Sequence, residues 1–128
     1  MTESAPRPLT VDVIDIHHEL HAALRRILPR LLPEGTRLRT HVTQGDFYSA
    51  VRPDDLPDVL VLSYQQSDLP VRDLVAKLKR EGFDGMTFLF TGGRPDAETI
   101  HAVDATYYKP DGFQALAKAI SLALNARR

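Results

Sequence analysis

The absence of cysteine is the first informative feature of this sequence. None of the 128 residues is Cys, which excludes thiol catalysis, a zinc finger and a disulfide framework. Charge of one sign is also lacking, because 16 Lys and Arg residues stand against 17 Asp and Glu, for a net charge of -1. Without a basic excess to neutralise phosphates, direct nucleic-acid binding is not expected. No apolar run approaches a membrane span and the N-terminus lacks a signal-peptide core, so we expect a cytoplasmic protein without membrane insertion.

What is present is the composition of an ordinary globular protein. Hydrophobic residues make up 43% and charged residues 26% of the chain, and this length is typical of one domain. The first eight residues, Met1 to Pro8, are polar and proline-bearing. We therefore expect residues 1–8 to be a flexible tail and residues 9–128 to form a single domain.

Strand-like and helix-like segments alternate along the domain. Five short apolar or alternating runs predict strands at 9–15, 36–42, 58–63, 86–91 and 104–108. Apolar residues at helical spacing predict helices at 20–31, around 47–51, 71–78, 96–103 and 113–124. In the short second helix, Phe47, Ala50 and Val51 are expected to face inward. This alternation predicts an α/β fold with a parallel sheet and helices on both faces.

Four polar side chains stand where predicted strands end. They are Asp15, Ser63, Thr91 and Lys109. In open parallel sheets, ligands and chemistry gather outside the C-terminal strand ends. We therefore expect these four residues to surround one pocket.

Four segments in this order resemble the response-regulator receiver domain, over about Leu9 to Ala126. They are VIDIHHELHAALRRIL (13–28), PDVLVLS (57–63), FLFTGG (88–93) and YKP (108–110). The resemblance implies a CheY-like, flavodoxin-like fold: a doubly wound five-stranded parallel sheet of order 2-1-3-4-5. The segment between Thr91 and Lys109 is shorter than the family norm, so the fourth helix should be short.

The sequence departs from the family at the residues that carry phosphorylation. The acidic pair after the first strand falls on Asp15 and Ile16, so one acid is lost. The phosphoacceptor aspartate falls on Ser63, while Thr91 and Lys109 match the family's hydroxyl residue and lysine. The resemblance thus implies a degenerate receiver, or pseudo-receiver, lacking the phosphoacceptor aspartate.

These departures change the chemistry that the pocket can perform. A receiver uses Mg²⁺ and a carboxylate nucleophile, but Mg²⁺ needs several oxygen ligands, and only Asp15 remains of three expected acids. We therefore expect no metal and no cofactor. Ser63 would need a general base to act as a nucleophile. We expect Lys109 to pair with Asp15 and donate to Ser63, and Asp68 to cap a helix that begins near Pro70.

Two nearby clusters have alternative interpretations. The histidines of the His17–His21 stretch could bind a metal at i, i+4 spacing, but surface exposure is expected instead. Gly92 and Gly93 could bind an anion through backbone N–H groups, although a loop that needs positive φ is the commoner reason for such glycines. Arg127, near the chain end, is expected to be solvated.

The resulting hypothesis is a non-enzymatic, phosphorylation-independent signalling module that acts by binding a protein partner. By the resemblance, the interface would lie around the fourth helix, fifth strand and fifth helix, with Tyr107, Tyr108 and Phe113 as candidate contacts, for a partner or for a second copy in a homodimer. The alternative is a purely structural role, in which both tyrosines pack against helices. Two other functions remain open: a small-ligand or anion sensor at the pocket, and a phosphoacceptor using Ser63 or Asp68.

Overall fold

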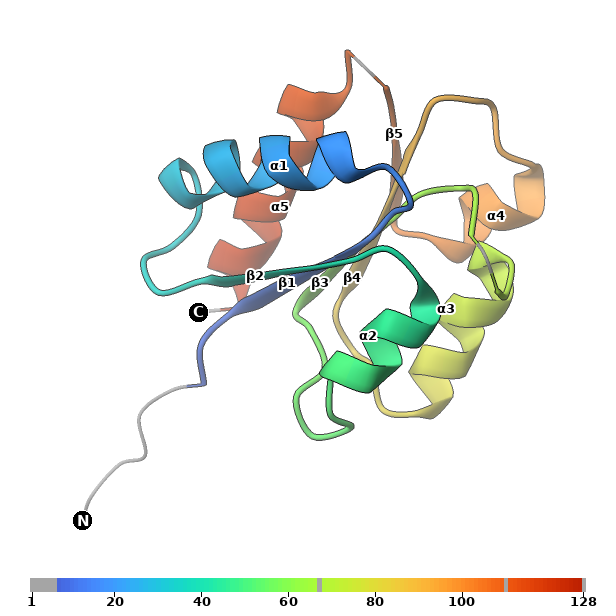
Figure 1. The fold of residues 1–128 in the computed structure, drawn as a ribbon, viewed down its shortest axis with the longest axis horizontal. Helices are drawn as coiled ribbons and strands as arrows, with labels where there is room; N and C mark the ends of the chain where they lie inside the picture. Colours follow the sequence, from blue (N-terminus) through green and yellow to red (C-terminus); the bar gives the residue numbers. More distant parts are fainter. Residues whose placement is uncertain (1–6, 67, 110, 128) are drawn as a thin grey trace.

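The computed structural model describes residues 7–66, 68–109 and 111–127 and contains one parallel sheet (Figure 1). The strands lie in the order β2-β1-β3-β4-β5 and all four neighbouring pairs are parallel. Their bounds are β1 Thr10–Ile14, β2 Arg37–His41, β3 Val59–Leu62, β4 Met86–Thr91 and β5 Ala105–Tyr108. The predicted fold class and strand order are confirmed.

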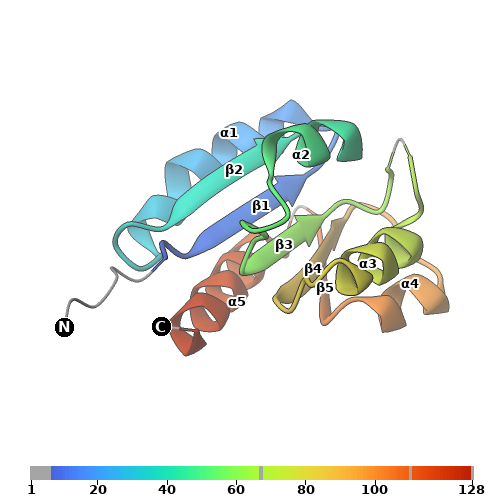
Figure 2. The same ribbon diagram turned by 90° about the horizontal axis from the view of Figure 1, so that it is seen from below.

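A helix follows each strand, and the helices form two layers (Figures 1 and 2). One face carries α1 (His18–Ile27) and α5 (Phe113–Ala126); the other carries α2 (Gln44–Ala50), α3 (Val71–Arg80) and α4 (Ala97–Ala102). With six residues, α4 is short as predicted. Among the described residues, no helix combines the length and apolarity that crossing a membrane requires.

Alternation along the strands divides the core in two. Val11 and Val13 of β1 pack with α1 and α5, whereas Ile14 packs with α2 and α3. All three side chains are fully buried, since successive strand residues point to opposite faces. Both faces of the sheet are therefore covered, as an all-parallel sheet requires.

Local signals account for most helix boundaries. Thr43 caps α2 by accepting from the N–H of Asp46 at 3.0 Å, and Asp96 caps α4 by accepting from that of Thr99 at 2.8 Å. After α3 the chain turns at Gly82, whose φ of 101° only glycine adopts readily.

Two predictions about helix faces and ends were wrong. Ala50 is exposed rather than inward, and α2 presents Phe47 and Tyr48 to the core. The first helix does not continue to Leu31: α1 ends at Ile27 and a 3-10 turn spans Leu28–Arg30. Pro29 in this turn cannot donate the hydrogen bond that an α-helix would need there.

An ion network lies on the face of β1 and β2 that α2 leaves partly uncovered. Asp12 is fully buried and accepts a bidentate pair of hydrogen bonds from Arg39, at 2.8 and 2.7 Å. His41 Nε2 lies 2.8 Å from the same carboxylate. Arg39 and Arg37 also donate to Asp55, at 2.9 and 2.7 Å. We call these five residues the buried ion network.

Charge pairing within this network favours the ionised forms of Asp55 and Arg39. Burial alone would raise the pKa of Asp55, but hydrogen bonds from Arg37 and Arg39 outweigh it and lower that pKa. Burial would likewise lower the pKa of Arg39, yet Asp12 and Asp55 raise it. The network is thus compensated within the fold and leaves no charge free for a ligand.

Asp58, just before β3, forms a second buried ion group. Its carboxylate accepts from the backbone N–H of Thr10 at 2.8 Å, from Arg127 at 2.8 Å and from Arg7 at 3.0 Å. Arg127 is exposed, as expected, but its guanidinium also pairs with Asp58 and with Asp84 at 3.2 Å, which was not predicted. Residues 1–6 of the expected tail lie outside the described residues, whereas Arg7 is tied to the domain.

Candidate functional site

The four polar residues predicted to surround a pocket do meet at one edge of the sheet. Thr91 is the last residue of β4, and Asp15, Ser63 and Lys109 directly follow β1, β3 and β5. The first three are buried, with Asp15 only 1% exposed. Because all strands are parallel, their C-terminal ends bring these side chains together.

Asp15 is held by two partners. Its Oδ2 accepts from Lys109 Nζ at 3.0 Å, as predicted. Its Oδ1 accepts from the backbone N–H of His17 and lies 2.8 Å from His17 Nδ1. Both carboxylate oxygens are therefore engaged, which leaves Asp15 poorly placed to act as a base for another group.

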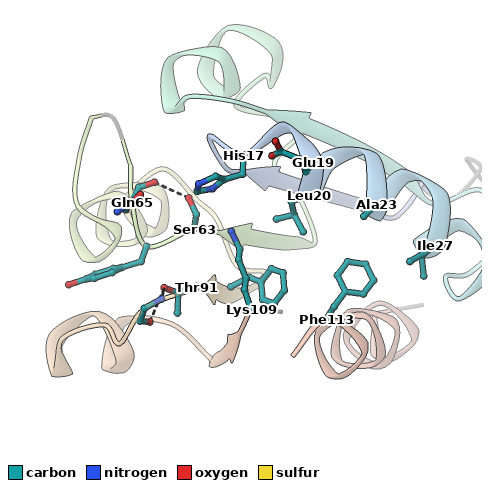
Figure 3. A pocket seen from close by; sticks show the side chains of 14 residues that line it. His17, Glu19, Leu20, Ala23, Ile27, Ser63, Gln65, Thr91, Lys109 and Phe113 are labelled. Atoms are coloured by element: carbon teal, nitrogen blue, oxygen red, sulfur yellow. Dashed lines mark hydrogen bonds between the residues drawn. The ribbon is translucent and has the colours of Figure 1, made fainter. Parts of the chain in front are cut away.

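Ser63 is satisfied by its own loop rather than by Lys109. Its Oγ donates to the backbone carbonyl of Gln65 at 2.9 Å (Figure 3) and accepts from Gln66 Nε2 at 3.2 Å. Among the described residues, Lys109 bonds to Asp15 and makes no hydrogen bond to Ser63, so that expectation was wrong. The competing carbonyl belongs to the turn that follows β3, which no sequence pattern revealed.

Gln66 is a structural residue that the sequence analysis missed. Its amide donates to the carbonyls of Ile14 at 3.2 Å and of Ser63 at 2.9 Å. It therefore joins the ends of β1 and β3 directly above the serine. A single polar residue in a loop gives no sequence signal for such a bridge.

The Thr91–Gly93 loop closes the other side of the pocket. Thr91 Oγ1 donates to the carbonyl of Gly93 at 3.0 Å and accepts from its N–H at 3.1 Å (Figure 3). The explanation of Gly92 and Gly93 by positive φ was wrong, because among the described residues only Gly35 and Gly82 have positive φ. A Cβ added to Gly92 or Gly93 would meet no atom within 4 Å. Neither conformation nor packing therefore demands glycine there.

The donor set at this edge does not fit the Mg²⁺ that receiver chemistry uses. Asp15 already serves Lys109 and His17, Ser63 is uncharged, and Ile16 is an apolar side chain, 40% exposed. Within residues 7–66, 68–109 and 111–127, no three His, Asp or Glu side chains are grouped to hold a metal. A hard octahedral cation needs more carboxylate oxygen than this pocket offers.

The histidines behave differently from one another. His17 is half exposed and pairs with Asp15. His21 is 7% exposed, so its predicted surface position was wrong. Its Nε2 has no hydrogen-bond partner among the described residues. Burial lowers the pKa of His21, although Asp15 acts in the opposite direction.

Asp68 does not cap the third helix. The residue preceding α3 is Pro70, and no side chain caps this helix. Asp68 is exposed in the loop before it. Pro110 of the YKP segment lies outside the described residues.

The three candidate interface residues have distinct environments. Tyr107 packs against the α1/α5 core, with its ring 6.0 Å from that of Phe88. Tyr108 points to the opposite face and is 46% exposed. Phe113, the first residue of α5, lies half-buried at the pocket. Of the three, Tyr108 has the freest side chain.

The pocket extends beyond the four predicted residues. It is a cavity of about 740 Å³ that continues from the strand ends along α1 (Figure 3). Leu20, Ala23 and Ile27 of α1 line this extension together with Phe113 of α5. Helical spacing predicted the helices that carry these residues but not the cavity, because periodicity does not show whether two facing helices touch.

Among the comparisons with known proteins, the one with solved structures gave matches. No protein-family model matches the chain. No curated protein matches its sequence. Solved structures do match, among them the receiver domain of a DNA-binding response regulator (merR) from Colwellia psychrerythraea 34H, at 17% identity and a TM-score of 0.77, covering 91% of this chain and 98% of that one.

Two further structures extend the comparison. A CheY-like receiver domain protein from Methanospirillum hungatei JF-1 shares 16% identity and a TM-score of 0.76, covering 94% of this chain and 97% of that one. The response regulator TrrA from Thermotoga maritima, solved in complex with Mg²⁺-BeF, shares 18% identity and a TM-score of 0.69, covering 91% and 99%. The chain thus has the five-stranded fold of CheY-like response-regulator receiver domains.

Proposed function

We propose that this protein is a cytoplasmic, receiver-like signalling module whose state is not set by aspartyl phosphorylation, and which acts by binding a protein partner rather than by catalysis. One observation carries this proposal: Ser63, which directly follows the central strand β3, has a neutral side chain whose hydroxyl donates a hydrogen bond within its own loop. A receiver of the ordinary kind would carry its phosphoacceptor carboxylate there.

The surroundings of Ser63 argue against a substitute phosphorylation chemistry. A serine nucleophile needs a base that removes its proton, and the oxygens of Asp15 are occupied by Lys109 and His17. TrrA was solved in complex with Mg²⁺-BeF. The described residues of the pocket in this chain offer no set of acidic side chains for such a ligand. Asp68 lies exposed in the following loop, away from the strand end.

The partner surface is proposed on the β5 side of the molecule. β5 is an edge strand that pairs only with β4 in the described chain, and the six-residue α4 leaves its end open. Tyr108 and Ile100 expose 46% and 37% of their surfaces there. An aromatic anchor with exposed apolar neighbours is typical of residues that dominate protein interfaces.

Incubation with acetyl phosphate and Mg²⁺, followed by intact-mass spectrometry, tests the first half of the proposal. The wild-type chain should remain unmodified. A double variant, Ile16→Asp with Ser63→Asp, returns two acids to the strand ends and should gain one phosphoryl group. A wild-type adduct that disappears in Ser63→Ala or Asp68→Ala would overturn the proposal and assign the acceptor.

Affinity capture from the native cell tests the second half. A partner that binds wild type should be lost in Tyr108→Asp. Leu31→Asp is the matched control, because Leu31 is 48% exposed on the turn that follows α1, away from β5. Equal loss in both variants, or no loss in Tyr108→Asp, would place the interface elsewhere.

A further inference from the structure

We propose that the cavity between α1 and α5 is a binding site for a small amphipathic monocarboxylate, with its apolar body between the two helices and its carboxylate at Lys109. This inference goes beyond the proposed function and stands whether or not the protein has the partner surface described above. Its size is the first argument: a cavity of about 740 Å³ falls within the ~300–1,000 Å³ usual for small-molecule sites.

The apolar arm of the cavity is formed by a stripe of α1 that is less deeply buried than its neighbour. Leu20, Ala23 and Ile27 follow one another at i, i+3 and i+7, line the cavity and remain half-buried. The adjacent stripe, Leu24 and Leu28, is fully buried in the core. The first stripe therefore keeps apolar surface that faces the cavity.

The opposite wall and the floor are aromatic. Phe113, at the start of α5, points toward α1 across the cavity (Figure 3). Phe90 of β4 is buried beneath it, with ring centroids 6.3 Å apart. Deeper in the core, Leu116 and Ile120 of α5 are fully buried, so on the α5 side the cavity is lined by Phe113. A hollow of this shape suits an inserted molecule better than a flat protein surface.

The polar end offers donors to a head group. Lys109 Nζ carries three N–H groups, and in the described part of the chain one of them is used, by Asp15. The Gly92–Gly93 backbone lies beside it in the cavity lining. Side chains at these two positions would meet no protein atom within 4 Å, so glycine here keeps the entrance open.

The charged side chains around the cavity favour a ligand head group with a single negative charge. Lys109 is partly neutralised by Asp15, whose other carboxylate oxygen is engaged by His17. Glu19 adds a negative charge on the exposed side of the lining. A carboxylate brings one charge to Lys109, whereas a doubly charged phosphate would face Glu19 without a second lysine.

Titration of the ¹⁵N-labelled protein with decanoate, below its micelle concentration, tests the site. Decanoate should shift the amide signals of Ala23, Gly92, Gly93 and Phe113 saturably. Decanol should bind about tenfold more weakly, as expected for loss of one charge-assisted hydrogen bond. Decyl phosphate should bind more weakly than decanoate, and decyltrimethylammonium should leave these signals in place.

Matched variants locate the ligand. Ala23→Phe fills the apolar arm and should abolish decanoate binding, whereas Ala22→Phe, at the exposed neighbouring position, should bind as wild type does. Lys109→Gln should weaken decanoate about tenfold and leave decanol unchanged. Gly93→Val, a substitution with free space around it, should weaken decanoate without unfolding the chain.

Several outcomes would overturn the proposal. Equal binding of decanoate, decanol and the ammonium compound would indicate surfactant-like adsorption. Shifts that persist in folded Ala23→Phe would place the ligand elsewhere. Shifts at these amides that depend on protein concentration without any ligand would assign the cavity to a second copy of the chain.

Discussion

Two buried aspartates, Asp12 within β1 and Asp15 directly after it, show how differently two regions of this sheet use charge. Asp12 lies in the buried ion network, where Arg39 grips it with two hydrogen bonds and His41 adds a third contact. Asp15 lies at the cavity, where Lys109 and the half-exposed His17 hold it. Both carboxylates are buried and both are paired, but their partners differ in burial and geometry.

This difference separates a structural charge from an available one. The fork of Arg39 matches the carboxylate of Asp12, which is fully buried, so Asp12 cannot return to water without opening the fold. Lys109 is a flexible point charge facing an open cavity and can turn to a ligand at little cost. A buried ion pair alone therefore does not identify a binding site, whereas an ion pair beside an open cavity does.

The largest effect is expected from Asp12→Asn. This substitution leaves Arg39 buried with a weakened partner and should lower the free energy of unfolding by about 3 kcal/mol. Urea denaturation measures the change. Asp54→Asn, which alters net charge equally at a position with 78% side-chain exposure, should cost no more than about 0.5 kcal/mol. Equal losses would show that net charge, rather than pairing, is responsible.

Asp58→Asn should rank second, with a loss of about 2 kcal/mol. Arg127 would lose a charged acceptor, but it keeps Asp84 as a more exposed one. The same urea assay measures the change, and Arg127→Met should account for most of it when the two substitutions are combined. Additive losses would instead mean that Asp58 acts mainly through Thr10 or Arg7.

The fold could be predicted because its signals are local and repeated. Alternating strands and helices predict the parallel sheet, and the spacing of Val71, Leu74 and Leu78 predicts the buried face of α3, which is confirmed. Errors and omissions arose where contacts between distant segments determine the structure. The ion pair of Arg127 with Asp58 was not predicted, because the two residues lie 69 positions apart in the sequence.

The candidate site could be predicted only in part, for a related reason. Strand ends are recognisable in sequence, so Asp15, Ser63, Thr91 and Lys109 could be brought together in advance. The cavity depends instead on a gap between helices distant in sequence, and Leu20 has the same apolar character whether or not Phe113 touches it. Hydrogen bonds to loop backbone, such as the one that the Ser63 hydroxyl donates to the Gln65 carbonyl, leave no pattern in the sequence.

Asp15→Asn should have a smaller effect than either network substitution, about 1 kcal/mol. Lys109 and His17 can turn to water once the charge is gone, because both lie at the cavity. Denaturation beside Asp12→Asn makes the comparison direct, since the two positions are three residues apart and both side chains are buried. A loss as large as that of Asp12→Asn would mean that the cavity end is also a structural ion pair.

The smallest effect is expected from the titration of His21. Burial lowers the pKa of its imidazole, with His18 and Arg25 adding to the effect and Asp15 opposing it, while the unfolded chain binds the proton with a pKa of about 6.5. Below that value the unfolded state therefore holds more protons, so stability is greatest above it and falls as the pH drops. Denaturation midpoints measured at pH values on both sides of 6.5 should decline less in His21→Leu than in wild type. His18→Leu removes the exposed neighbour and should retain most of the decline; an unchanged slope in His21→Leu would show that His21 does not carry the pH dependence.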